Sequence, residues 1–246
     1  MRVLLLGGTA EARTIAAELA PSVDVISSLA GRVSAPRLPV GAARVGGFGG
    51  TAGLARFLRA EHVDAVVDAT HPFAATITAH AAEAASMTGR PLLVLRRPGW
   101  TAGPGDDWTR FADISAAARH IARTAPGTVF LTSGRRDLAA FATDATHDYL
   151  VRAVDPPDGP VPPRMILLLA RGPYTVDGEL DLMRTHSVAT LVTKDSGGAL
   201  TQAKLVAARD LAVPVVMIDR PALPDGVDAV ASVDAVTRWV GQLGSG

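Results

Sequence analysis

Short apolar runs alternate with helix-like stretches along the chain. Runs rich in Val, Leu and Ala are typical of strands that are covered on both faces of a parallel sheet. In the first half, strands are predicted over 1–6, 23–29, a short segment ending near 45, 63–69 and 92–95, and helices over 10–20, 54–59 and 72–87. This alternation indicates an α/β layer.

The second half repeats the alternation. Strands are predicted over 128–131, 149–154, 164–169, 189–192 and 213–218, and helices over 114–123, 138–142, 176–186, 200–211 and 233–243. Residues 96–107, between the halves, are rich in Pro and Gly, which is typical of a linker. We therefore predict two Rossmann-like, doubly wound parallel-sheet domains, residues 1–97 and 98–246, with a cleft between them.

The composition narrows the possible functions. The chain contains no cysteine, which excludes disulfides, zinc–thiolate sites and cysteine nucleophiles. Basic and acidic residues number 24 each, so no overall field would attract nucleic acid. The apolar run at residues 3–6 is too short for a signal peptide or a membrane span. We expect a cytoplasmic protein with neither a nucleic acid nor a membrane as partner.

The first strand runs directly into a glycine turn. It is followed by Gly7, Gly8, Thr9, Ala10 and Glu11, which open the first helix. A glycine turn at a helix N-terminus can cradle a phosphate. The dinucleotide fingerprint is only partly met, because Gly7 and Ala12 fit while Thr9 replaces the middle glycine. A tight turn without a ligand is the alternative.

The end of the second predicted strand bears on the choice of cofactor. An NAD site usually carries Asp or Glu about 20 residues beyond the glycine turn. Here Ser27, Ser28 and Arg32 occupy that neighbourhood, with no carboxylate among them. Hydroxyls and a guanidinium suit the 2′-phosphate of NADPH. The alternative is that Arg32 is a solvated loop residue.

Two further turns after strands are candidate cofactor sites. The first contains Gly47, Phe48, Gly49 and Gly50, and the second contains Thr70, His71, Pro72 and Phe73. Glycines allow close approach of the backbone to a ligand, and open parallel sheets bind ligands at strand-to-helix turns. Of the six histidines only His71 lies at a predicted strand end, so it is the candidate catalytic proton carrier. A structural glycine loop and a helix-capping His71 are the alternatives.

Turns in the second half are cationic and hydroxylic, which suits a substrate that carries carboxylates or phosphates. The candidate substrate-binding residues are Ser133, Arg135, Lys194, Asp195, Ser196 and Gly197. Arg135 could instead begin a solvated helix, and Lys194 could pair with Asp195. No metal site is expected, since the chain has no H-E-x-x-H helix and His71 and His80 are poorly spaced for ligands.

Four motifs occur together in an order and spacing that resemble the precorrin-6A reductase family. They are Leu5-Leu6-Gly7-Gly8-Thr9-Ala10-Glu11, Gly47-Phe48-Gly49-Gly50, Asp68-Ala69-Thr70-His71-Pro72-Phe73-Ala74 and Thr193-Lys194-Asp195-Ser196-Gly197-Gly198. The later Val213-Pro214-Val215-Val216-Met217-Ile218-Asp219-Arg220-Pro221 also resembles a near-terminal strand of that family. The resemblance covers essentially the whole chain.

This resemblance implies NADPH-dependent reduction of one double bond of a tetrapyrrole, from precorrin-6A to precorrin-6B, in cobalamin biosynthesis. It also implies an NADPH-binding first domain and a substrate in the cleft. The acetates and propionates of a precorrin would give the second domain's arginines a role. The presence of cobalt in the substrate and the oligomeric state, a monomer included, stay open.

Two other functions are alternatives. A non-catalytic NADP-binding redox sensor could use the same turns of the first domain. It would not need the three polar turns of the second half, which are residues 132–136, 171–174 and 193–198. A short-chain dehydrogenase would need a Tyr-x-x-x-Lys pair, and neither Tyr149 nor Tyr174 has a lysine four residues later.

Overall fold

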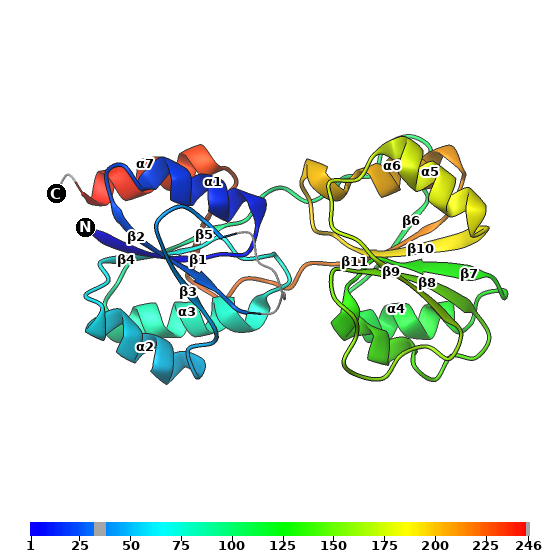
Figure 1. Ribbon diagram of the computed structural model, residues 1–246, viewed down its shortest axis with the longest axis horizontal. Coiled ribbons are helices and arrows are strands. Elements are labelled where there is room, and N and C mark those ends of the chain that lie inside the picture. The colour runs from blue at the N-terminus through cyan, green and yellow to red at the C-terminus, as the bar shows by residue number, and fades with distance from the viewer. Residues whose placement is uncertain (32–37, 245–246) are drawn as a thin grey trace. The chain divides into compact units, whose positions relative to one another are not determined.

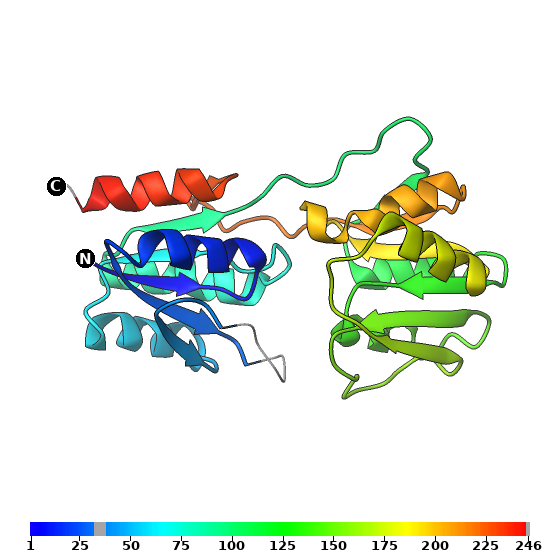
Figure 2. The same cartoon turned by 45° about the horizontal axis from the view of Figure 1, so that its top comes forward.

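The computed structural model describes residues 1–31 and 38–244 of the chain (Figure 1). It contains two compact units. The first unit comprises Met1–Pro98 and Pro221–Gly246, and the second comprises Gly99–Arg220. The chain therefore passes twice between the units, once near residue 98 and once near residue 220 (Figure 2).

The first unit contains a parallel sheet with helices on both faces. Its strands are β1 (Arg2–Leu6), β2 (Asp24–Leu29), β3 (Ala42–Val45), β4 (Ala65–Asp68), β5 (Leu92–Leu95) and β12 (Asp228–Val230), in the order β12-β5-β4-β1-β2-β3. Helices α1 (Ala10–Leu19) and α7 (Val233–Leu243) cover one face, and α2 (Gly50–Ala60) and α3 (Ala75–Thr88) cover the other (Figure 1).

The core of this unit explains why β1 is apolar without a break. Alternate residues of a strand point to opposite faces of the sheet. Val3 and Leu5 pack in the cluster with α1 and α7, while Leu4 and Leu6 pack in the cluster with α2 and α3. A continuous apolar run is therefore required wherever a strand is covered twice.

The second unit is built in the same way. Its strands are β6 (Trp108–Phe111), β7 (Thr128–Leu131), β8 (Asp148–Ala153), β9 (Met165–Leu169), β10 (Val188–Lys194) and β11 (Val215–Ile218), in the order β6-β11-β10-β7-β8-β9, again all parallel. One face carries α4 (Ile114–Ile121) and the 3₁₀ helix η1 (Arg135–Phe141). The other face carries α5 (Val176–Thr185), the 3₁₀ turn η2 (Ala199–Thr201) and α6 (Ala203–Asp210) (Figure 1). The predicted pair of parallel α/β sheets is confirmed.

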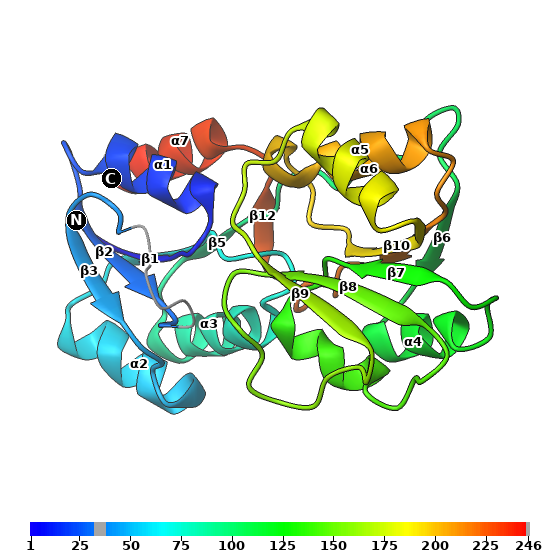
Figure 3. The ribbon, with the colours of Figure 1, turned by 45° about the vertical axis from the view of Figure 1, so that its right-hand side comes forward.

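The sixth strand of the first sheet, β12, does not follow the fifth, β5, in the chain, whereas the six strands of the second sheet are consecutive. After β5 the chain leaves the first unit, and β6 pairs with β11 in the second sheet. The last strand, β12, returns to pair with β5 in the first sheet (Figure 3). Helix α7 returns with it and buries Val236 and Val240 in the first unit's core. The assignment of all of residues 98–246 to one domain is therefore wrong for the segment from Pro221 onward.

Among the described residues, no helix combines the length and apolar character that a membrane crossing requires.

Candidate functional site

The predicted cofactor turns lie at one edge of the first sheet, because parallel strands present their carboxyl ends together. Hydrogen bonds join these turns. The Gly7 N–H donates to the Ser28 carbonyl at 2.9 Å, which ties the turn after β1 to the end of β2. The Thr9 hydroxyl donates to the Ala69 carbonyl at 2.7 Å, which ties the same turn to the end of β4. Three of the predicted segments thus form one continuous surface.

Each glycine of the first turn has a different reason to be glycine. A Cβ on Gly7 would lie 3.3 Å from the Ala12 Cβ, so this position lets the turn approach α1 closely. Gly8 has a φ of +114°, which side chains rarely adopt, and nothing lies within 4 Å of the place where its Cβ would be. The turn is therefore open on the side of Gly8, as a backbone that approaches a ligand requires.

Arg44, which the sequence analysis did not single out, organises the edge beyond β2. It lies on β3 directly opposite Ser28 in the parallel register. Its guanidinium donates to the Ser28 hydroxyl at 2.9 Å and to the carbonyls of Gly46 and Gly47 at 3.0 Å each. It also lies 3.9 Å from the centroid of the Phe48 ring. The predicted Ser28 and the predicted glycine loop are brought together by this one side chain. Arg32 lies outside the described residues.

The helices that start at this edge differ in their capping. Thr9 caps α1, since its side chain accepts from the Ala12 N–H. Helix α2 begins after Gly49 and helix α3 after Ala74, and neither residue makes a side-chain capping bond. Uncapped N-terminal N–H groups can bind a phosphate. Glu11, in the first turn of α1, forms an ion pair with Arg97 at 3.0 Å.

The loop before α2 depends on a glycine that the sequence analysis missed. A Cβ on Gly53 would lie 1.7 Å from the Phe48 carbonyl oxygen, so only glycine fits there without displacing the loop. Phe48 packs edge-on against Phe57 of α2, with ring centroids 5.1 Å apart. Gly49 and Gly50 have φ values of +79° and +80°. The aromatic ring therefore faces the helix while the glycine backbone stays exposed.

A buried carboxylate shapes the turn after β4. Asp68 is 1% exposed and accepts from the N–H and the hydroxyl of Thr70, at 3.0 and 2.7 Å. Its other oxygen accepts from the Thr78 hydroxyl of α3 at 2.6 Å. Asp68 therefore holds the Thr70 turn against α3, and this explains why an acidic residue ends an otherwise apolar strand.

His71 is exposed on this turn, and its ring orientation is set by the backbone. Its Nδ1 accepts from the Phe73 N–H at 3.3 Å, and the two rings lie 5.8 Å apart. The neutral ring that accepts at Nδ1 carries its proton at Nε2. A ligand at this turn would therefore meet a ring whose Nδ1 is engaged by the backbone.

A hollow of about 240 Å³ lies beside this turn in the first unit. Its wall is mainly apolar, and it is lined by Pro72, Ala75, Thr78, Ala79, Arg96, Pro221, Ala222, Leu223 and Pro224. Arg96 donates to the Pro221 carbonyl at 2.7 Å, which holds the returning chain segment against the end of β5. The hollow therefore exists only because the C-terminal segment rejoins the first unit.

The predicted substrate residues lie at the carboxyl ends of β7 and β10. The Ser133 hydroxyl is buried and has no hydrogen-bond partner in the described part of the chain. Arg135 donates to the Pro156 carbonyl at 2.9 Å, and Lys194 forms an ion pair with Asp137 at 2.7 Å. Ser196 donates through its N–H to the Lys194 carbonyl at 2.7 Å. Lys194 and Asp195 do not form the pair that was the alternative.

Asp195 has partners of a different kind. Its carboxylate is 7% exposed, accepts from the Trp100 N–H at 2.9 Å and pairs with Arg110 at 2.8 Å. Arg220 donates to the Asp195 carbonyl at 2.6 Å. A Cβ on Gly99 would lie 2.8 Å from the carboxylate. Asp195 therefore anchors both segments that enter and leave the second unit, and Gly197, with a φ of +64°, completes its loop.

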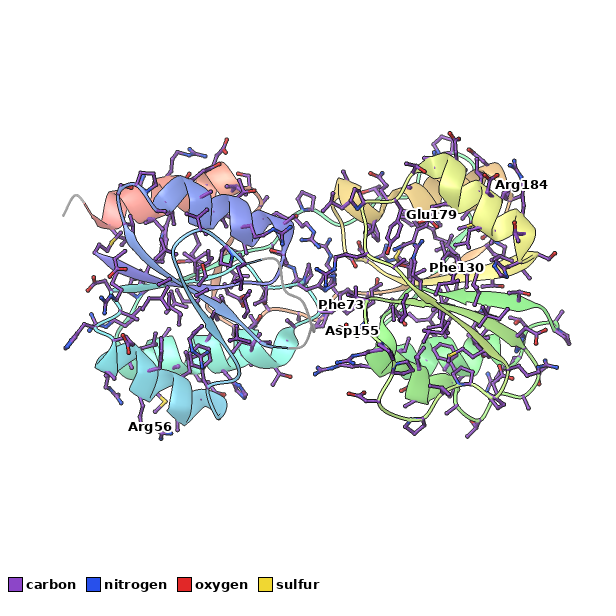
Figure 4. All side chains as sticks on the ribbon, in the orientation of Figure 1. Arg56, Phe73, Phe130, Asp155, Glu179 and Arg184 are labelled. Atoms are coloured by element: carbon purple, nitrogen blue, oxygen red, sulfur yellow. The ribbon has the colours of Figure 1, made fainter. Side chains whose placement is uncertain are left out.

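A buried charged cluster lies between the second sheet and helices α5 and α6. Arg152 pairs with Glu179 at 2.8 Å, with 8% and 1% of the side chains exposed, and its guanidinium lies 3.7 Å from the Tyr174 ring centroid. The Lys204 ammonium lies 5.3 Å from the Trp100 ring centroid. Burial, together with the nearby charge of Arg152, lowers the pKa of Lys204 to about 7. Figure 4 labels Glu179 on α5, above the sheet.

Known proteins match the chain over its whole length. A precorrin-6A reductase of Rhodococcus erythropolis is 55% identical, covering 98% of both chains, and one of Mycobacterium tuberculosis (strain ATCC 25618 / H37Rv) is 53% identical, covering 99% of both. The family model described as precorrin-6x reductase CbiJ/CobK matches residues 2–241. The chain belongs to the precorrin-6x reductase family. A solved structure of CobK precorrin-6A reductase superposes on the reductase with a TM-score of 0.92 and 44% identity, covering 99% of this chain and 97% of that one.

These matches confirm the family, the reductase activity and the place in cobalamin biosynthesis that the four motifs implied. They also exclude the alternative function, a non-catalytic NADP-binding redox sensor. Two arginines of the reductase, Arg44 and Arg110, and the loop glycine Gly53 were not singled out from the sequence. Arg44 could have been found from its place opposite Ser28, once β2 and β3 are paired in parallel. Arg110 could not, because no strand was predicted around it.

Proposed function

We propose that the chain transfers hydride from NADPH to one carbon–carbon double bond of precorrin-6A, with the cofactor at the carboxyl edge of the first sheet and the tetrapyrrole on the second unit. The observation that carries this proposal is the hydrogen-bonded row of turns formed by Gly7, Thr9, Ser28 and Ala69. It places an open glycine backbone at the edge where sheets of this strand order bind dinucleotides. NADPH, when bound, supplies the hydride.

Different segments of the first unit would bind different parts of the cofactor. The Gly7–Glu11 turn would face the pyrophosphate, and the uncapped N-termini of α2 and α3 offer further N–H groups to phosphate oxygens. The exposed Gly47 and Gly49 and the partly exposed Gly50 would allow the backbone to approach the adenosine half beside Phe48. Thr70 to Phe73 and the adjacent hollow would receive the nicotinamide half.

The choice of NADPH over NADH is supported by the end of β2. Ser28 lies where an NAD site carries a carboxylate, and its hydroxyl accepts from a guanidinium. A carboxylate there would repel the 2′-phosphate, whereas a hydroxyl and a cation attract it.

We expect the purified protein, mixed with precorrin-6A, to consume NADPH much faster than NADH at equal low concentration. A charge-assisted phosphate contact contributes roughly 1.5–3 kcal/mol, which corresponds to about a 10- to 100-fold preference. The fall of reduced-nicotinamide absorbance measures both rates. Equal rates with the two cofactors would contradict the choice of NADPH, and no consumption with either would contradict the reaction.

On the second unit, Ser133, Arg135, Lys194, Ser196 and Gly197 would hold the carboxylates of the tetrapyrrole. The buried Ser133 hydroxyl supports this, since a polar group of this kind usually has a partner that a ligand could supply. Asp195 is left out of this set, because its carboxylate is engaged by the protein and its charge would repel a substrate carboxylate.

The reduction also requires a proton, and His71 is the proposed donor, in the imidazolium form, which returns to the neutral ring when it gives up one proton. The residue is exposed at the carboxyl edge of the first sheet, and in the neutral form of the ring Nδ1 accepts from the Phe73 N–H. A positioned acid of this kind contributes typically 10²- to 10⁴-fold to a rate.

Replacing His71 separates proton donation from capping. In His71→Asn, the amide oxygen can still accept from the Phe73 N–H, but the side chain cannot titrate. We expect His71→Asn and His71→Ala both to lower turnover by about 10²-fold, because each lacks the proton carrier. Steady-state kinetics with precorrin-6A varied would measure this. If His71→Asn restores the turnover that His71→Ala loses, His71 is a cap and not the donor.

A further inference from the structure

Arg44 is a cation that has no ion pair with any carboxylate in the described ranges 1–31 and 38–244. Its three hydrogen-bond acceptors, the Ser28 hydroxyl and the carbonyls of Gly46 and Gly47, are all uncharged. Burial of the guanidinium lowers the pKa of Arg44. A partly buried charge without a counter-ion is costly, and an anionic ligand would offset that cost.

The geometry of the guanidinium leaves donors for such a ligand. Arginine has five N–H groups in a planar fork. NH1 donates twice, to Ser28 and Gly46, and NH2 donates once, to Gly47. The Nε–H and one NH2 hydrogen therefore remain. The Phe48 ring, 3.9 Å from the guanidinium carbon, covers one face and prevents the side chain from turning away.

The position of Arg44 identifies the anion. It lies on β3 opposite Ser28, beside the carboxyl end of β2, where sheets of this strand order recognise the adenosine ribose. NADPH differs from NADH only in the 2′-phosphate of that ribose. A fork of parallel N–H groups matches phosphate oxygens in a way that a lysine ammonium does not.

We infer that Arg44 selects NADPH over NADH by holding the 2′-phosphate with the donors that its own protein contacts leave free. This inference rests on the proposed function, because it requires a nicotinamide dinucleotide at this edge. Ser28 and the glycine loop act as the frame that aims the fork. The same contacts explain why an arginine is held rigidly on a short edge strand.

The test measures binding without turnover. Dissociation constants of NADPH and NADH, and of adenosine 2′,5′-bisphosphate and adenosine 5′-phosphate, are determined by calorimetry for four proteins: the wild type, Arg44→Ala, Arg44→Lys and Arg56→Ala. Arg56 is an exposed arginine of α2 in the same unit and points away from the sheet, so it controls for net charge (Figure 4). Thermal unfolding verifies that each variant is folded.

We expect Arg44→Ala to weaken binding of NADPH and of the bisphosphate by roughly 10- to 100-fold while leaving NADH and the monophosphate nearly unchanged. Arg44→Lys should lose part of the preference, and Arg56→Ala none. The inference is overturned if Arg44→Ala keeps the wild-type ratio, if Arg56→Ala lowers the ratio equally, or, should the alanine variant not fold, if Arg44→Lys keeps the ratio in full. A wild type without any preference would instead contradict the proposed use of NADPH.

Discussion

Lys204→Met is expected to raise the free energy of unfolding relative to the wild type, and to raise it more at about pH 6 than at about pH 9.5. The pKa of Lys204 is about 7 in the folded protein and 10.5 for an unperturbed lysine. Between these values the unfolded chain holds a proton that the folded protein has released, so wild-type stability increases with pH. Below pH 7 the folded protein carries the buried ammonium and its full penalty. With about 1.4 kcal/mol per pKa unit, the difference between the two conditions is roughly 3–5 kcal/mol.

Urea unfolding of the wild type and Lys204→Met at both pH values measures this effect. The chain has only one other lysine, Lys194, so Lys194→Met is the matched control, and carbon-13-labelled lysine gives just two side-chain signals to titrate. Methionine retains most of the buried stem but carries no charge. A gain from Lys204→Met that is the same at both pH values would show that Lys204 does not titrate between them.

Asp195→Ala is expected to destabilise the second unit by about 3–5 kcal/mol. Removing the Asp195 carboxylate takes a counter-charge from Arg220, which lies 3.6 Å away and is only 9% exposed, and the buried Trp100 N–H also loses its acceptor. Arg110 provides the comparison, because it pairs with Asp195 at 2.8 Å and with Asp219 at 2.6 Å. These carboxylates are 7% and 42% exposed.

Asp219→Ala is therefore the matched control. It removes a carboxylate from the same arginine, but at an exposed position, and should cost at most about 1 kcal/mol. Chemical unfolding followed by tryptophan fluorescence compares the variants. Equal losses for Asp195→Ala and Asp219→Ala would mean that burial does not distinguish the two pairs, contrary to the role of Asp195 as an anchor.

The hydrophobic pattern of the sequence was sufficient to predict those helices and strands whose burial is determined by nearby segments of the chain. β1 is covered on both faces and β4 leads into a helix, so both show their apolar pattern directly. β6 and β12 have four and three residues and include Arg110 and Asp228. Such strands form because a sheet edge completes them, and that edge is built from residues distant in the chain. Hydrophobic periodicity therefore could not assign them or the domain to which the C-terminal segment belongs.

The same distinction, between local and distant determinants, applies to the residues of the candidate site. Glycine turns after strands could be predicted, because a turn at a strand end is a local property. The buried contacts of Asp195 and Lys204 could not be predicted, since their partners come from other elements. Asp195 looked like a ligand residue from its motif, yet its partners are Trp100 and Arg110, far away in sequence. Lys204 carried no signal at all, because burial of a lysine is visible only once α6 packs on the sheet.

The return of the chain to the first unit has a consequence for synthesis on the ribosome. The second unit is one continuous segment, Gly99–Arg220, whereas the first unit needs β12 and α7 from the end of the chain. Domains generally fold as units while the chain emerges. The second unit can therefore finish folding before the first one. The first unit keeps an open sheet edge at β5 until β12 and α7 have left the exit tunnel. A ribosome that stalls before β12 and α7 emerge would carry a folded second unit joined to an unfinished first one.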